Sequence, residues 1–166
     1  MPGPAIRTDV VDVYVLRRRA QGPGGVADVE FLQLRRVSPP APGTWQPVMG
    51  HIEAEETPGQ AAIRELSEEI GLWPGLPGWL GLWVLQEVRP YYYASSNVVM
   101  MSVCFAAEVG EEFEPTPGAE HGDYRWVWSS EAERAFLWLS QRGACEEILR
   151  EIVSPASAVR ELLRVM

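Results

Sequence analysis

A glutamate-rich segment near the middle of the chain constrains the fold most strongly. Its charged side chains are Arg64, Glu65, Glu68 and Glu69. A helix turns by about 100° per residue, so the second and third glutamates would lie within roughly 60° of the first, on one face. The opposite face carries the apolar residues Ala62, Leu66 and Ile70, which suit packing against a sheet. The pattern therefore predicts an amphipathic helix.

Both ends of this helix are marked in the sequence. Thr57 is a candidate N-cap, and Gln60 three residues later completes a capping box. Pro58 stands at the first helical position, where proline is favoured. Gly71 follows the last apolar residue and suits a helix stop. A helix over 58–70 is expected, preceded by a tight loop that begins at Gly50.

The acidic face of this helix has two interpretations. Three carboxylates on one face repel one another, which is mildly destabilising. Most such faces are simply solvated. Alternatively, a hard divalent cation removes the repulsion, because Mg²⁺ prefers carboxylate oxygen and water. The helix pattern alone does not decide between these interpretations.

Composition narrows the class of protein. A chain of 166 residues, 46% of them hydrophobic, predicts a single domain over 1–166 with a substantial core. The net charge of −9 argues against a long nucleic acid as partner, but not against a small nucleotide bound through metal ions. Cys104 and Cys145 lack metal-ligand spacing and are expected to be reduced thiols in a cytoplasmic protein. No apolar run reaches membrane-spanning length.

The remaining segments predict mainly strands, then helices. Residues 1–7 are expected to form a loose arm. The expected strands cover 10–16, 29–37, 45–49, 79–89, 97–109 and 124–128, with the first two paired as a hairpin. The expected helices cover 130–141 and 142–153, joined at Gly143, with a last short helix over 156–166. Arg17, Arg18 and Arg19 end the first strand, as a solvated turn or, as an alternative, a phosphate site.

The spacing of the central segment resembles a known family. Residues 50–72 match every fixed position of the Nudix box: the glycines at both ends, Glu56, the arginine, the three glutamates and the apolar positions 66 and 72. The chain resembles Nudix hydrolases over roughly residues 8 to 150. This resemblance implies an α/β fold, an α/β/α sandwich with a mixed β-sheet. It also implies an enzyme that uses Mg²⁺ or Mn²⁺ to hydrolyse phosphoric anhydride bonds.

The resemblance also implies roles for individual residues. Glu65, Glu68, Glu69 and the Gly50 carbonyl would bind metal. Arg64 would orient the glutamates, notably Glu56. Relatives place a further glutamate before a strand that reads roughly Tyr-x-Trp, and Glu120 matches that pattern. Glu120 is the expected general base, with Glu69 as the alternative.

Other residues are candidates for substrate binding. Arg35 or Arg36 would bind phosphate, because an arginine near this point often faces the substrate in the family. Tyr91 or Tyr92 would stack on a base or pterin ring, although tyrosines at a strand edge are the plainer alternative. His51 is a further candidate, or an exposed loop residue.

The resemblance leaves the substrate open. The short sequence segments around the box most resemble those of bacterial dATP and dihydroneopterin triphosphate pyrophosphohydrolases. This resemblance implies that the enzyme cleaves a triphosphate to a monophosphate and pyrophosphate. Dinucleoside polyphosphates and ADP-ribose are the alternatives, and a Nudix module that senses a nucleotide without cutting it is a third. The residue before Glu56 is often glycine in the family but is Glu55 here, which puts the loop shape in doubt. A monomer or homodimer is expected.

Overall fold

A mixed sheet forms the centre of the computed structural model, which describes residues 3–23, 28–39 and 41–166. Its strand order is β10-β3-β2-β9-β6, with β4 paired to β3 and β5 paired to β2. The strands are β2 (Val10–Arg19), β3 (Asp28–Arg36), β4 (Trp45–Gln46), β5 (Val48–His51), β6 (Trp79–Val84), β9 (Val103–Val109) and β10 (His121–Trp128). The predicted hairpin is confirmed, since β2 and β3 are antiparallel, whereas β2 and β9 are parallel.

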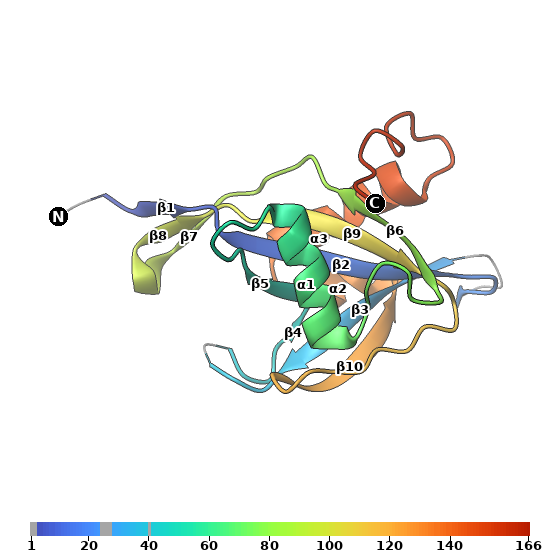
Figure 1. Cartoon of the computed structure of the whole chain (residues 1–166), viewed down its shortest axis with the longest axis horizontal. Helices are drawn as coiled ribbons and strands as arrows, with labels where there is room; N and C mark the ends of the chain where they lie inside the picture. Colours follow the sequence, from blue (N-terminus) through green and yellow to red (C-terminus); the bar gives the residue numbers. More distant parts are fainter. Residues whose placement is uncertain (1–2, 24–27, 40) are drawn as a thin grey trace.

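Helices cover both faces of this sheet (Figure 1). Helix α1 (Pro58–Ile70) packs on one face, against a core that includes Val11, Val13 and Val15 of β2. Helices α2 (Ala132–Ala135) and α3 (Leu139–Glu147) cover the other face, where Tyr14 and Leu16 of the same strand are buried. Alternate residues of one strand thus enter two separate cores. The expected α/β/α sandwich is confirmed.

Helix α1 forms as the sequence predicts. The Thr57 side chain accepts a hydrogen bond from the Gln60 backbone, and the Gln60 side chain bonds back to complete the capping box. Gly71 ends the helix at φ 70°, a left-handed conformation that glycine adopts at low cost.

The expectation of a loose amino-terminal arm was wrong. Ala5–Arg7 forms a strand, β1, instead of a loose segment, and Met1 and Pro2 lie outside the described residues. Strand β1 pairs in parallel with β8 (Val98–Met100), which also pairs with β7 (Tyr91–Tyr93). The strand expected over 97–109 is therefore two strands, because β8 leaves the main sheet to join this small one. The strand expected over 79–89 ends at Val84.

The carboxyl-terminal helices also differ from expectation. Residues 130–141 do not form one helix, because the chain becomes extended at Phe136, which is buried beside Tyr14 and Phe31. Gly143 lies inside α3 instead of joining two helices, and α3 continues as a π-helix over Ile148–Val153. Residues 156–166 form turns and no helix. Among the described residues, no helix is long and apolar enough to cross a membrane.

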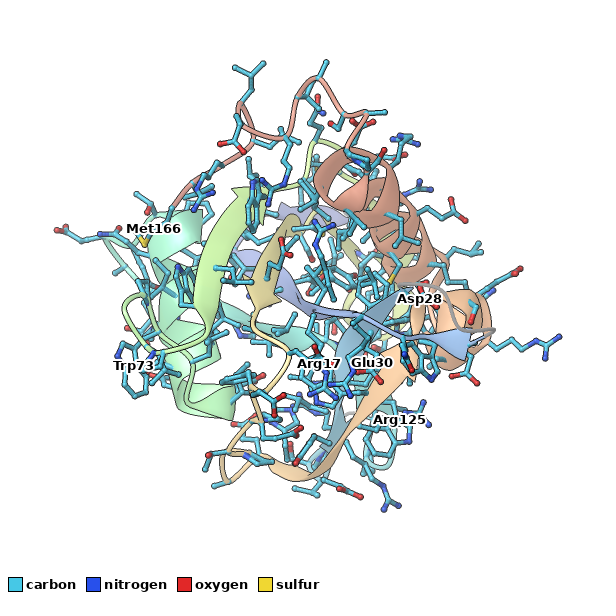
Figure 2. The ribbon with its side chains drawn as sticks, turned by 90° about the vertical axis from the view of Figure 1, so that its right-hand side faces the viewer. Arg17, Asp28, Glu30, Trp73, Arg125 and Met166 are labelled. Carbon is cyan, nitrogen blue, oxygen red and sulfur yellow. The ribbon has the colours of Figure 1, made fainter. Side chains whose placement is uncertain are left out.

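The triple arginine is structural. Arg17, Arg18 and Arg19 continue β2 and form ion pairs with glutamates of neighbouring strands and loops. Arg17 lies 2.7 Å from Glu30, and Figure 2 shows this pair near the turn end of the hairpin. Neither a solvated turn nor a phosphate site describes these residues, since the charges are neutralised within the protein.

Candidate active site

The acidic face of α1 is divided between buried and exposed carboxylates. Glu65 and Glu69 are about nine-tenths buried, whereas the side chain of Glu68 is 60% exposed. The predicted face therefore exists, but only two of its three glutamates point into the protein. Among the described residues no group of three or more His, Cys, Asp or Glu side chains stands in a metal-binding cluster.

Arg64 lies at the centre of the box. Its guanidinium makes two hydrogen bonds of 3.0 Å to the carboxylate of Glu56. It also donates to Glu65 at 2.7 Å and to the carbonyl of His51 at 2.7 Å. These bonds tie the loop after β5 to the helix. The pair with Arg64 lowers the pKa of Glu56, so that carboxylate stays ionised.

Glu69 is in a strained electrostatic environment. Burial, with the charge of Glu65 beside it, raises its pKa to about 8. Its Oε2 atom is excluded from solvent and has no hydrogen-bond partner. Burial also raises the pKa of Glu65. Arg64 compensates the charge of Glu65, whereas Glu69 forms no ion pair among the described residues.

The residues present fit a divalent metal. The donors are anionic oxygens, which Mg²⁺ and Mn²⁺ favour. A cation beside Glu69 would supply the partner that its Oε2 atom lacks. Gly50 borders the same point, because a Cβ built on it would overlap the Glu65 carboxylate. With any larger residue at this position, the Glu65 carboxylate would have to move away from the backbone.

The loop before β10 brings Glu120 to the box. The backbone of Gly118 donates to the Glu69 carbonyl at 2.8 Å, and that of Thr116 donates to the Ile70 carbonyl at 3.0 Å. Glu120 follows in an exposed position, and its charge contributes to the raised pKa of Glu65 and Glu69. Two segments about 50 residues apart in sequence thus meet at the end of α1.

A single cleft of about 1820 Å³ connects the box to the aromatic strand β7. Small-ligand sites are typically about 300–1,000 Å³, so this cleft has room for a large polyphosphate. Tyr91, Tyr92 and His51 line it, as does Arg36. Arg36 is held by bonds to the Ser38 and Pro39 carbonyls.

Arg35, by contrast, is absent from the residues that line the cleft. Leu32 and Leu34 face the α1 core, so the strand alternation puts Arg36 on the α1 face of the sheet and Arg35 on the opposite face. Of the two arginines, the fold therefore leaves Arg36 as the phosphate candidate.

Several residues of the cleft were not predicted from the sequence, among them Asp12, Gln46, His121 and Trp138. His121 is buried and lies 3.4 Å from Gln46, and burial lowers its pKa. The available signal was weak. Only Asp12 stands out, as a lone acidic residue within the apolar strand Val10–Leu16.

Comparison with known proteins agrees with this geometry. The NUDIX domain family matches residues 7–147, so the chain belongs to that family. Dihydroneopterin triphosphate diphosphatase of Haemophilus influenzae is 35% identical over 99 residues, covering 55% of this chain and 61% of that protein. Nudix hydrolase 4 of Arabidopsis thaliana is 32% identical, covering 53% and 45%. An octanoyltransferase of Myxococcus xanthus is 35% identical over 126 residues, covering 75% of this chain. The chain spans only 31% of that protein.

Solved structures share the fold. The Escherichia coli dihydroneopterin triphosphate pyrophosphohydrolase superposes with a TM-score of 0.69 at 22% identity, covering 89% of this chain and 98% of that chain. A Caenorhabditis elegans Ap4A hydrolase binary complex gives 0.68 at 19% identity, covering 87% and 96%. The NUDIX domain of Shewanella oneidensis NrtR, complexed with ADP ribose, gives 0.66 at 16% identity, covering 90% and 89%.

Proposed function

We propose that this chain is a pyrophosphohydrolase that cleaves a nucleoside or pterin triphosphate to a monophosphate and pyrophosphate, with Mg²⁺ or Mn²⁺ as cofactor. The observation that carries the proposal is the shared cleft. It joins the buried carboxylates of Glu65 and Glu69 at one end to the tyrosines of β7 at the other. A triphosphate attached to a flat ring fits this arrangement, with its phosphates near the carboxylates and its ring near the tyrosines.

The metal would be held by Glu65, Glu68 and Glu69, with the Gly50 carbonyl as a further ligand. A bound divalent ion supplies charge neutralisation for the polyphosphate and lowers the pKa of a bound water. Glu69 has to lose its proton to bind the metal. Because its pKa is about 8 in the metal-free chain, the affinity for the metal increases with pH.

Arg64 and Glu56 position the metal ligands. The paired bonds between them fix the guanidinium, which in turn holds Glu65. Glu120 takes a proton from the attacking water, because it is exposed in the cleft and close enough to influence Glu69 electrostatically. Glu69 is the alternative base. Most of the acceleration comes from positioning and charge neutralisation.

The substrate is held at both ends of the cleft. Arg36 binds a phosphate, since it is oriented by backbone carbonyls and lies on the cleft side of β3. Tyr91 stacks on the ring, with Tyr92 beside it, and Tyr92 is fixed by a 2.9 Å bond to Asn97. The similarity to a dihydroneopterin triphosphate diphosphatase supports a substrate with phosphates at one end and a ring at the other.

A dinucleoside polyphosphate is the second candidate substrate. The cleft volume of about 1820 Å³ leaves room for a second nucleoside, and an Ap4A hydrolase shares the fold. ADP-ribose is a third candidate. A sensor that binds a nucleotide without cutting it is the least favoured, because all the box glutamates are present.

Product analysis tests these proposals. Purified protein with Mg²⁺ is incubated with dNTPs, dihydroneopterin triphosphate, dinucleoside polyphosphates and ADP-ribose, and the products are separated by chromatography. The expected result is a monophosphate and pyrophosphate from a triphosphate. Cleavage of only the dinucleotides or ADP-ribose would overturn the substrate assignment. Binding without turnover on the whole panel would favour the sensor.

A further inference from the structure

Asp12 lies at the inner end of the cleft, in the middle of the sheet. On strand β2 it pairs with Met49 of β5 on one side and with Cys104 of β9 on the other; Figure 1 shows the three strands side by side. By strand alternation its side chain shares the face of Tyr14 and Leu16, toward α2 and α3. Almost every residue of this strand is apolar up to Leu16. A carboxylic acid at this position is therefore unusual and suggests a specific role.

Two polar atoms at this point lack partners. Asp12 Oδ1 and Ser102 Oγ are excluded from solvent, and neither makes a hydrogen bond of normal geometry, although the Ser102 hydroxyl is close enough to Asp12 to offset part of the rise in its pKa. Ser102 is only 7% exposed. Buried polar groups without a hydrogen bond are costly and rare in native proteins. The nearest thiol, Cys104 Sγ, is 4.0 Å from the other Asp12 oxygen and is a weak donor.

Both side chains line a narrow recess, which we call the Asp12 recess, at the base of the cleft. Asp12, Arg89 and Tyr91 border the recess and the cleft alike, so the recess opens into the substrate cleft. Its free volume of about 10 Å³ admits one water-sized group. It therefore takes an edge of a ring and not a whole ring.

The other two carboxylates that line the recess have partners within the protein, since Glu87 pairs with Arg89 at 2.7 Å and Glu147 has a structural role. Glu147 is 2% exposed, but its Oε1 accepts a bond of 2.7 Å from the Gln86 backbone. Its Oε2 accepts from the Glu87 backbone at 3.3 Å. Both oxygens are thus used to hold the segment that follows β6. Asp12 has no equivalent task, which leaves its carboxylate available to a ligand.

We infer that Asp12, assisted by Ser102, is the specificity group of the cleft and accepts hydrogen bonds from a ring edge with two adjacent donors. The inference rests on the proposed function and deepens it. An ionised carboxylate only accepts hydrogen bonds. The 2-amino-4-oxo ring of guanine or a pterin presents a ring N–H and an amino group side by side, which match its two oxygens. Adenine presents one donor and one acceptor, so it leaves an oxygen unpaired.

The sharpest test compares two substrates that differ by one group. Deoxyinosine triphosphate is dGTP without the 2-amino group. At about pH 8.5 the Asp12 carboxylate is mostly ionised, because burial raises its pKa to only about 7. The kcat/KM for dGTP is expected to exceed that for dITP by about 10–100-fold. In Asp12→Asn this ratio should fall to near one, whereas Ser102→Ala should reduce it partially.

Asp123→Asn is the matched control, because Asp123 is exposed and does not line the cleft. It should keep the wild-type ratio. Equal kcat/KM for dGTP and dITP in the wild-type chain would overturn the inference without any variant. An unchanged ratio in folded Asp12→Asn would overturn it as well, since a merely structural residue does not change substrate preference.

Binding measurements separate this inference from the proposed function. Calorimetry gives the Kd of dGMP and dIMP for the wild-type chain and for Asp12→Asn. Tighter binding of dGMP, lost in the variant, supports the Asp12 assignment even if no triphosphate is hydrolysed, and in that case only the proposed function fails. Hydrolysis of triphosphates with no preference for the 2-amino group leaves the proposed function intact and rejects the assignment.

Discussion

Individual carboxylates in this chain differ sharply in what surrounds them. Glu56 and Glu147 are fully hydrogen-bonded within the protein. Glu69 and Asp12 each keep one buried oxygen without a partner. The two classes have different consequences on substitution, because a carboxylate without partners loses no bonds when it becomes an amide.

Glu69→Gln should lower turnover by orders of magnitude while the fold is retained. The amide cannot serve as an anionic metal ligand or as a base. Steady-state kinetics with Mg²⁺ and thermal unfolding without metal measure the two effects. The exposed Glu133→Gln on α2 serves as the control. Near-normal activity in Glu69→Gln would contradict the metal assignment.

Asp12→Asn should stabilise the chain in a pH-dependent way. The pKa of Asp12 is about 7 in the folded chain, because of burial, and about 3.9 when unfolded. Between these values the folded state binds more protons, so stability falls as pH rises from about 4 to about 7. Asp12→Asn has no carboxyl group to titrate at this position, so its stability does not fall over this pH range for this reason.

Urea unfolding of the wild-type chain and Asp12→Asn checks this prediction. The gain in unfolding free energy should be near zero at about pH 4 and on the order of 4 kcal/mol above about pH 8. A gain that does not vary with pH would show that Asp12 is not buried as an unpaired acid.

At the scale of elements, the loop between β5 and α1 contains one unfavourable backbone conformation. Glu55 adopts φ 68°, a left-handed conformation that costs a non-glycine residue about 1–2 kcal/mol. Glycine adopts this conformation at low cost, so the position favours glycine although this chain carries a glutamate there.

Glu55→Gly should therefore raise the free energy of unfolding by about 1 kcal/mol. Glu53→Gly in the same loop is the comparison, since Glu53 does not have a positive φ. It should instead lower stability by about 0.5–1 kcal/mol through the greater freedom of the unfolded chain. Denaturant titration of both variants measures the difference, and a loss of stability in Glu55→Gly would contradict the strain.

At the scale of the whole molecule, the end of the chain completes the edge of the main sheet. Backbone bonds join Leu82 and Val84 of β6 to residues 163–166, and Figure 1 shows the carboxyl terminus beside β6. Leu163 is 8% exposed and belongs to the core that contains Trp83. The neighbouring Leu162 is 82% exposed.

Leu163→Ala should lower the free energy of unfolding by about 2–3 kcal/mol, because it leaves a cavity beneath the sheet edge. Leu162→Ala makes the same chemical change on the surface and should stay within about 0.5 kcal/mol of the wild-type chain. Thermal unfolding compares the pair. Similar losses in both variants would show that this segment does not pack on β6.

Features that depend on local spacing could be predicted from the amino-acid sequence. Helix α1, its caps and its acidic face follow from residues 57–71, because capping and amphipathicity act over a few residues. The hairpin of β2 and β3 was likewise predicted, and the α/β/α class followed from the resemblance to Nudix hydrolases. The helix expected over 142–153 is present within α3 and its π-helical continuation. The other two terminal helices are not, because burial of Phe136 broke one and pairing with β6 replaced the other.

The residues that line the cleft could not be predicted from local spacing, because they come together only in the folded sheet. Arg35 and Arg36 are equivalent in sequence, and strand alternation in the folded sheet separates them. Asp12 and Ser102 lie 90 residues apart along the chain and meet because β2 and β9 are paired. Chemistry that local spacing encodes is visible in the sequence. The proposed substrate choice depends on side chains that only long-range pairing brings together.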